Sequence, residues 1–225
     1  MRDLYIFGDS ILKGVYFSDE HGKHKLTRDQ YAPLEEAGFH VRNHSLMGAT
    51  VDAGLSAVQK RCDALSAGEE KPIILLEYGG NDCDYRWEQI SASPDSLHEP
   101  RTPMEKFREL YGQLITFARS LGAKVYLCNL VPLDSPRYMQ WISRNLDKDA
   151  IMHWLGDPSM LYRWQEYYNR TTEQIAAAFS CPLIDIRSLF LTSHAYSGLL
   201  SSDGIHPTIQ GHQLIGRKIA GVLGE

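Results

Sequence analysis

A serine near the start of the chain and an aspartate–histidine pair near its end are the residue types of a hydrolytic triad. Ser10 lies in the pentapeptide Phe7-Gly8-Asp9-Ser10-Ile11, directly after a short apolar run. Asp203 and His206 lie together in the tetrapeptide Asp203-Gly204-Ile205-His206. A serine hydroxyl is a poor nucleophile until a neighbouring base takes its proton, and a histidine oriented by a carboxylate does this near neutral pH. The two ends of the chain therefore predict Ser10 as nucleophile, His206 as general base and Asp203 as its orienting carboxylate.

These residues need a scaffold that brings the two ends together, and the pattern between them alternates strand and helix. Short apolar runs predict buried strands at 4–7, 41–44, 73–77, 125–130 and 183–186. Helical patterns follow them at 28–37, 51–67, 103–121, 160–179 and 208–223. Such alternation predicts an α/β fold, a three-layer α/β/α sandwich around a parallel sheet. Ser10 then lies at the carboxyl end of the first strand, where this architecture places ligands.

The chain shows no internal repeat and no low-complexity linker, so we expect one domain spanning residues 1–225. Two segments, near 84–101 and 134–158, are longer than simple connections. Both leave the carboxyl edge of the predicted sheet, where long loops are often functional. They are therefore interpreted as insertions at the active-site edge.

The two insertions are rich in aromatic residues. One hypothesis is that these side chains form the wall of an acyl or sugar pocket above the nucleophile. The alternative is that they form a small satellite core that attaches the insertions to the domain, because tryptophan is usually largely buried. The candidate substrate-binding residues are Trp87, Tyr138, Trp141 and Trp154.

Composition narrows the class of protein further. A chain of 225 residues with 43% hydrophobic residues suits one globular domain, and a formal net charge of −5 disfavours a nucleic-acid partner. No apolar run approaches the ~20 residues of a membrane span, and no targeting segment precedes the first strand, so we expect a cytoplasmic protein. The cysteines show no C-x-x-C pair, which argues against a disulfide framework or a zinc site. They are Cys62, Cys83, Cys128 and Cys181.

Four sequence blocks occur in a fixed order: Gly8-Asp9-Ser10, Gly48, Gly79-Gly80-Asn81-Asp82 and the Asp203–His206 tetrapeptide. With these blocks the chain resembles the SGNH, or GDSL, hydrolase superfamily over essentially its whole length. The resemblance implies a flavodoxin-like, five-stranded parallel sheet and a serine esterase or acylhydrolase activity without a cofactor. By position, it also implies that Gly48 and Asn81 belong to the oxyanion hole.

The chemistry of acyl transfer agrees with these roles. The tetrahedral intermediate carries a negative oxygen that needs preorganised hydrogen-bond donors. The backbone N–H groups of Ser10 and Gly48 and the side-chain amide of Asn81 are three such donors. A glycine at position 48 also lets the backbone approach a substrate closely.

Some of these residues also have purely structural interpretations. Ser10 could be the N-cap of the helix that follows it, and Asn81 could belong to an ordinary Asx turn. Cys83 has no activating partner in the sequence and is expected to take no part in the reaction. The closest histidine pairs are His21 with His24, in a polar loop, and His40 with His44, too far apart on a strand to share one ion. We therefore expect no metal.

The sequence thus predicts a carboxylic ester hydrolase that forms an acyl-enzyme on Ser10. Its expected substrate is a small-molecule ester, with a short-chain acyl or acetyl group on a soluble, carbohydrate-like alcohol. Lysophospholipase or thioesterase activity on the same triad stays open, as does a non-catalytic ligand-binding protein of the same fold. No G-x-G-x-x-G pattern follows the first strand and every triad position is filled, which argues against the binding protein.

Overall fold

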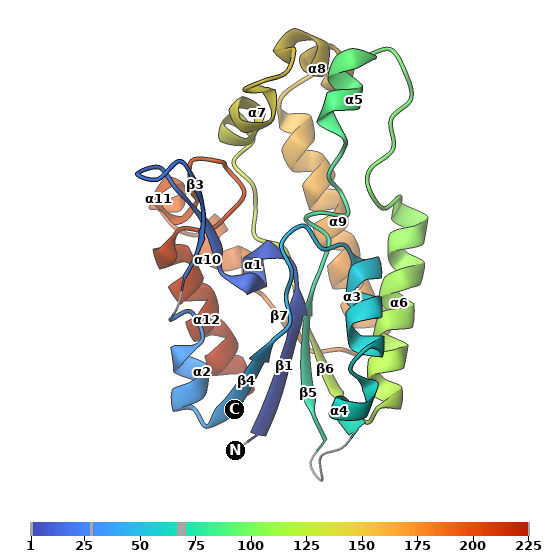
Figure 1. The fold of residues 1–225 in the computed structure, drawn as a ribbon, viewed down its shortest axis with the longest axis vertical. Coiled ribbons are helices and arrows are strands. Elements are labelled where there is room, and N and C mark those ends of the chain that lie inside the picture. Colours follow the sequence, from blue (N-terminus) through green and yellow to red (C-terminus); the bar gives the residue numbers. More distant parts are fainter. Residues whose placement is uncertain (1, 28, 67–70, 225) are drawn as a thin grey trace.

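The computed structural model of the chain describes residues 2–27, 29–66 and 71–224. At its centre lies a five-stranded parallel sheet with strand order β4-β1-β5-β6-β7 (Figure 1). This order places the second strand of the sheet beside the first and the others on the far side, which is the flavodoxin-like arrangement. The strands are β1 (Arg2–Gly8), β4 (Phe39–Asn43), β5 (Ile73–Glu77), β6 (Lys124–Cys128) and β7 (Leu183–Ile184). All five predicted strands are confirmed.

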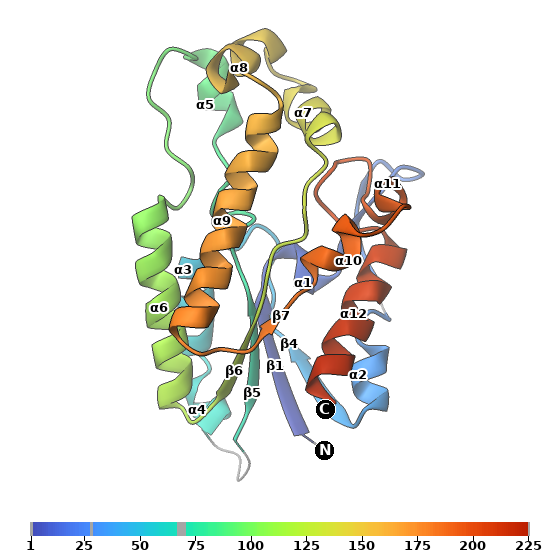
Figure 2. The ribbon, with the colours of Figure 1, turned by 180° about the vertical axis from the view of Figure 1, so that it is seen from behind.

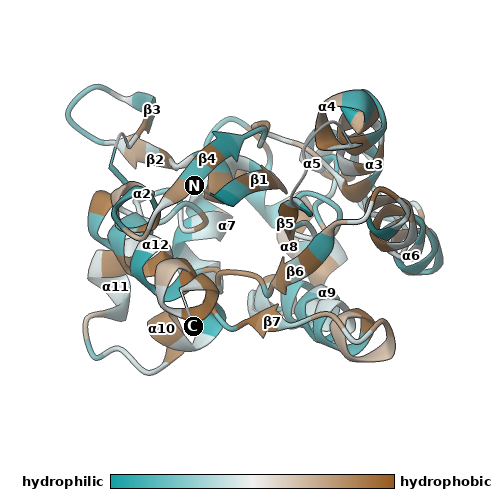
Figure 3. Cartoon of the chain, turned by 90° about the horizontal axis from the view of Figure 1, so that it is seen from below, coloured by the Kyte–Doolittle hydropathy of each residue, from teal (hydrophilic) through white to brown (hydrophobic). Residues whose placement is uncertain are grey.

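The central strands are buried on both faces because helices cover each side of the sheet. Along β1, Leu4 and Ile6 pack into one hydrophobic cluster, whereas Tyr5 and Phe7 pack into the other. Successive side chains of a strand point to opposite faces, so one continuous apolar run supplies both cores. Figures 2 and 3 show the resulting layers, with α3, α6 and α9 on one face and α2 and α12 on the other. The three-layer sandwich is confirmed.

The long helices lie close to their predicted positions, and the short ones differ. The pattern at 51–67 is divided into two helices. After the first helix the Arg61 backbone N–H bonds to the Val58 carbonyl, and its guanidinium donates to the Ala57 carbonyl. The pattern at 28–37 gives only a short helix, and residues 28 and 67 lie outside the described ranges. The helices concerned are α2 (Ala32–Glu36), α3 (Val51–Gln59), α4 (Cys62–Ser66), α6 (Met104–Ser120), α9 (Ser159–Ala178) and α12 (Ile209–Leu223).

Both insertions contain helices that the sequence did not predict. They lie beyond the carboxyl ends of the strands, at the top of Figure 1. Their side chains form a third hydrophobic cluster, separate from the two that flank the sheet. The helices are α5 (Trp87–Ala92) in the first insertion, and α7 (Ser135–Ser143) and α8 (Lys148–Leu155) in the second.

A small antiparallel hairpin was also not predicted from the sequence. It joins β2 (Val15–Ser18) to β3 (Lys23–Leu26) and is not part of the central sheet. Each strand is only four residues long, β3 reads Lys-His-Lys-Leu, and most residues of both strands are only partly buried, so no long apolar pattern marks the pair. The remaining short helices are α1 (Ser10–Lys13), α10 (Arg187–Leu191) and α11 (Tyr196–Leu199). Among the described residues, no helix is both long and apolar enough to cross a bilayer.

Candidate active site

Ser10 is the first residue of helix α1, immediately beyond the carboxyl end of β1. The N-cap of α1 is Asp9, whose Oδ1 accepts the backbone N–H of Ile11 at 2.8 Å. The interpretation of Ser10 as the N-cap is therefore wrong, because Asp9 already occupies that position. The Ser10 hydroxyl remains available for a different contact.

That contact joins Ser10 to the far end of the chain. The Ser10 Oγ lies 2.9 Å from His206 Nε2, and His206 Nδ1 lies 2.6 Å from Asp203 Oδ2. All three side chains are buried. A hydroxyl, an imidazole and a carboxylate thus form one hydrogen-bonded series, with each ring nitrogen facing a different partner.

The turn before α12 fixes the relative positions of Asp203 and His206. Asp203 Oδ1 accepts the backbone N–H groups of Ile205 and His206, at 3.1 and 3.0 Å. Gly204 has a φ of +78°, and a Cβ on it would lie 2.6 Å from the backbone nitrogen of Tyr138. Only glycine fits this left-handed position under the start of α7.

The charge of Asp203 follows from these contacts. Burial acts to raise the pKa of its carboxyl, but hydrogen bonds from the His206 ring, the charge of that ring and two backbone N–H groups outweigh it. The pKa of Asp203 is therefore lowered from its usual value. An ionised Asp203 can orient the imidazole and stabilise a positive charge on it.

The predicted oxyanion residues lie in two loops beside Ser10. Gly48 has a φ of +76°, in the loop after β4, and the N–H of Leu46 in the same loop donates to the Gly8 carbonyl at 3.0 Å. The Asn81 amide nitrogen donates to Asp9 Oδ2 at 2.9 Å, which leaves its second N–H for another acceptor.

Arg101 connects the two loops, and sequence reasoning missed it. Its guanidinium donates to the Asn81 Oδ1 at 3.4 Å and to the Gly48 carbonyl at 3.1 Å. Because the arginine occupies the amide oxygen, the amide nitrogen of Asn81 is directed toward Asp9. The only signal in the sequence is a basic residue at the end of the first insertion, which has no distinguishing pattern.

Two buried acids lie under these loops. Asp82 accepts the backbone N–H of Val51 at the start of α3, at 3.1 and 3.2 Å from its two oxygens. Burial raises the pKa of Asp82 to about 6. Burial also raises the pKa of Glu77 well above its usual value, and the neighbouring charge of Asp9 adds to this effect.

A pocket of about 280 Å³ opens at Ser10 and His206. Gly48 and Asn81 also line it, so all the sequence-predicted catalytic and oxyanion residues except the fully buried Asp203 border one cavity. We call Asp9, Ser10, Gly48, Asn81, Asp203 and His206 the polar floor. The opposite wall consists of rings from the insertions and α9, which we call the aromatic roof: Tyr85, Trp87, Tyr138, Trp141, Trp154 and Trp164.

The roof satisfies both hypotheses for the insertion aromatics at once. Its rings contact one another, as with Tyr85 and Trp154 at 4.8 Å between centroids, and all of them except Trp164 belong to the third hydrophobic cluster. They also line the pocket. Partly buried Asp84 binds two of them through Oδ1, which accepts Trp87 Nε1–H at 2.9 Å and the Tyr138 hydroxyl at 2.6 Å.

Cys83 also lines the pocket, and its chemistry is unfavourable for a nucleophile. Burial raises the pKa of its thiol well above the usual value, and the charge of Asp84 acts in the same direction. Because the thiolate is the reactive form, a thiol held protonated is inert.

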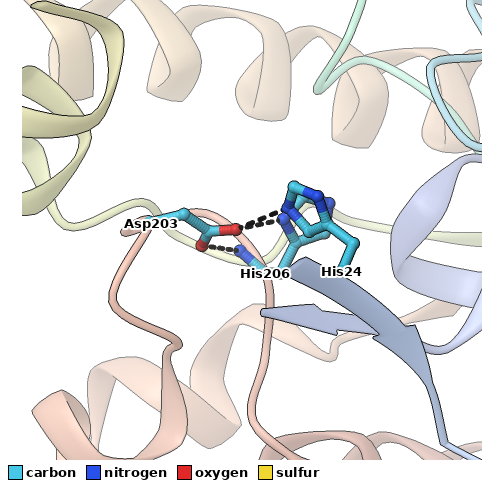
Figure 4. A group of neighbouring side chains, drawn as sticks. All are labelled: His24, Asp203 and His206. Carbon is cyan, nitrogen blue, oxygen red and sulfur yellow. Dashed lines mark hydrogen bonds and ion pairs between the residues drawn. The ribbon is translucent and has the colours of Figure 1, made fainter. Parts of the chain in front are cut away.

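One group of side chains in the described residues has the composition of a metal site. Single ligand atoms of His24, Asp203 and His206 all lie within 4.8 Å of one another (Figure 4). His24, on β3, was missed as a neighbour of the triad, because nothing in the sequence relates the hairpin to residues near 203. In this arrangement both imidazoles direct a nitrogen at Asp203 Oδ2, as hydrogen-bonding partners.

Comparison with known proteins extends these observations. The family model described as GDSL-like Lipase/Acylhydrolase matches residues 6–214. No curated protein matches the sequence. The chain is similar to the structure of a lipase/acylhydrolase from Enterococcus faecalis, with 20% identity and a TM-score of 0.63 over 100% of this chain and 96% of that chain.

Two further solved structures are acetyl xylan esterases. One is from Geobacillus stearothermophilus, with 16% identity and a TM-score of 0.64 over 99% of this chain and 94% of that chain. The other is named AlAXEase, with 18% identity and a TM-score of 0.59 over 98% of this chain and 99% of that chain. At these identities the likeness establishes a shared fold.

Proposed function

Because this chain belongs to the GDSL-like lipase/acylhydrolase family of ester-hydrolysing enzymes, we propose that it cleaves carboxylic esters through an acyl-enzyme on Ser10. The observation that carries the proposal is the hydrogen-bonded series of Ser10, His206 and Asp203, with distances of 2.9 and 2.6 Å. The Ser10 hydroxyl and the His206 ring line one pocket, and the buried Asp203 carboxylate contacts the His206 ring.

In the first half of the reaction, Ser10 Oγ attacks the ester carbonyl carbon while His206 Nε2 takes the hydroxyl proton. The carbonyl oxygen becomes an oxyanion, and the N–H groups of Ser10, Gly48 and Asn81 are its proposed hydrogen-bond donors. Asp203 stabilises the imidazolium that forms. When the intermediate collapses, the bond to the alcohol breaks and His206 gives its proton to the leaving oxygen.

In the second half, water replaces the alcohol. His206 takes a proton from the water, whose oxygen attacks the acyl carbon, and the same donors bind the second oxyanion. Collapse of this intermediate breaks the bond to Ser10 Oγ, and His206 returns the proton to the serine. The acid leaves and the enzyme is regenerated without a cofactor.

The roof suggests the kind of ester that fits. A cavity of about 280 Å³ lies just below the usual 300–1,000 Å³ of small-ligand pockets and is walled mainly by aromatic and aliphatic side chains. We propose a short-chain acyl ester of a small soluble alcohol. Acetylated sugars are one candidate alcohol class, in keeping with the names of two structural neighbours.

A second candidate substrate class, hydrolysed by the same mechanism, is suggested by the apolar lining of the pocket. Apolar side chains such as Leu133 and Leu161 line the same cavity as Ser10. An acetyl group would leave most of this apolar wall uncovered, whereas a longer acyl chain would cover it. Lysophospholipase or thioesterase activity is therefore the alternative.

The test is hydrolysis of p-nitrophenyl acetate, butyrate and octanoate by wild type and Ser10→Ala, without added metal. We expect wild-type activity and a loss of at least about 10⁴-fold in Ser10→Ala. Cys83→Ser, which alters the other candidate nucleophile in the pocket, is the control and should retain activity. The preferred chain length chooses between the two substrate classes. Activity that survives in Ser10→Ala would refute the proposed nucleophile.

A further inference from the structure

The Asp203 carboxylate is shared by two imidazole rings. Its Oδ2 lies 2.6 Å from His206 Nδ1 and 3.1 Å from His24 Nε2 (Figure 4). Its Oδ1 accepts two backbone N–H groups. Because an ionised carboxylate only accepts hydrogen bonds, the nitrogen that each ring directs at it must carry a proton. His24 therefore donates to the same oxygen that orients His206.

The ring of His24 is fixed by its surroundings. It contacts Phe17 and Trp141 edge-on, with centroid distances of 5.3 and 5.7 Å, and its centroid lies 4.8 Å from that of His206. The side chain is 26% exposed, whereas Asp203 is fully buried. A ring packed on three sides presents its nitrogen to Asp203 with little freedom to turn away.

The hairpin that carries His24 is attached to the same loop as Asp203. The N–H of Phe17 donates to Ser201 Oγ at 3.2 Å. At the turn, the Ser202 hydroxyl donates to Asp19 Oδ1. Two hydrogen bonds therefore attach the hairpin to the loop that His24 faces.

We propose that His24 is a positioning residue, which acts on the reaction through Asp203. This inference rests on the proposed function, in which Asp203 orients His206. A second donor on Oδ2 fixes the rotation of the carboxylate, so that this oxygen stays in line with His206 Nδ1. It also satisfies an acceptor that would otherwise be buried with one partner. His206 then keeps its Nε2 directed at Ser10 in every turnover.

Two substitutions separate the hydrogen bond from the packing. His24→Phe keeps a ring for the contacts with Phe17 and Trp141 but removes the donor. His24→Gln keeps an N–H at the distance of Nε2 but removes the ring. His21→Phe, in the turn of the same hairpin and away from the triad, is the control. Thermal unfolding of each variant verifies that it is folded.

We expect His24→Phe to lower kcat for p-nitrophenyl butyrate about ten-fold with little change in KM, and His24→Gln to restore most of the loss. Full kcat in His24→Phe would overturn the proposal. Equal losses in both variants would assign His24 to packing, and a change confined to KM would make it a substrate contact. Either result would overturn the proposal too.

A second readout does not depend on activity. The proton between His206 Nδ1 and Asp203 gives a far-downfield proton resonance, which should shift in His24→Phe and stay near its wild-type position in His21→Phe. An unshifted resonance in His24→Phe would contradict the inference even if no ester were hydrolysed. An inactive wild type with the expected shift would instead refute the proposed function alone.

Discussion

The polar floor and the aromatic roof face each other across one pocket, but different forces stabilise them. In the floor, Asp203 accepts hydrogen bonds from two rings and two backbone N–H groups, and Asp9 accepts from Ile11 and Asn81. In the roof, ring contacts dominate, and Asp84 is the polar centre for only two of the rings. Hydrogen bonds fix direction, whereas ring contacts depend mainly on burial and tolerate a change of shape.

From this difference we expect the floor and the roof to contribute differently to catalysis and to substrate selection. Catalysis requires donors held at hydrogen-bonding distance, about 3 Å, from the developing charge, and directional contacts can hold them there. Selection of an acyl or alcohol group requires apolar area of the right size, which the roof provides. Floor substitutions should therefore change kcat, and roof substitutions should change KM in a manner that depends on the substrate.

The largest effect is expected from Asn81→Ala, a substitution in the polar floor. Removing an oxyanion donor should lower kcat by about 10²–10³-fold with KM nearly unchanged, because the donor acts on charge that exists only in the transition state. Steady-state kinetics on p-nitrophenyl butyrate measures both constants. Asn145→Ala, an exposed asparagine outside the pocket, is the matched control. A loss that lies entirely in KM would contradict the assignment.

The buried acid Asp82, beneath the floor, is expected to make the free energy of unfolding of the protein depend on pH. Burial raises the pKa of Asp82 from 3.8 to about 6, so the native state binds this proton more tightly than the unfolded state does. Its ionisation therefore costs stability as pH rises through this window, by up to about 3 kcal/mol. Asn cannot ionise, so the free energy of unfolding of Asp82→Asn should rise relative to wild type between pH 4 and pH 7. Urea unfolding measures it; a difference independent of pH would refute this explanation.

The smallest expected effect is in the roof. Trp154→Ala should raise KM for p-nitrophenyl octanoate about ten-fold and leave the acetate nearly unaffected, because only a long chain reaches that ring. Leu97→Ala, a 93% exposed residue of the other insertion, is the control. An equal fall in kcat for both esters would show that the roof also positions the floor.

The sequence predicted the residues that line the pocket better than the residues that support them, for a physical reason. Apolar runs such as 73–77 must be strands between two layers, and a glycine or a triad residue at a strand end follows from local chemistry. His24 and Arg101 carry no such signal, because their roles depend on residues far away in the chain. The insertion helices pack on one another and on α9, not on the sheet, so they lack the sheet-facing apolar pattern by which the other helices were predicted.

The proposed mechanism depends most directly on the identity of the nucleophile. Wild type and Ser10→Ala would be treated with a fluorophosphonate, which reacts with activated serines, and the labelled peptide identified by mass spectrometry. We predict one adduct, on Ser10, at a rate that falls sharply in His206→Ala, and no adduct in Ser10→Ala. Two results would contradict the central claim that the polar floor activates this serine. One is an adduct on another residue, and the other is labelling of Ser10 at the same rate in His206→Ala as in wild type.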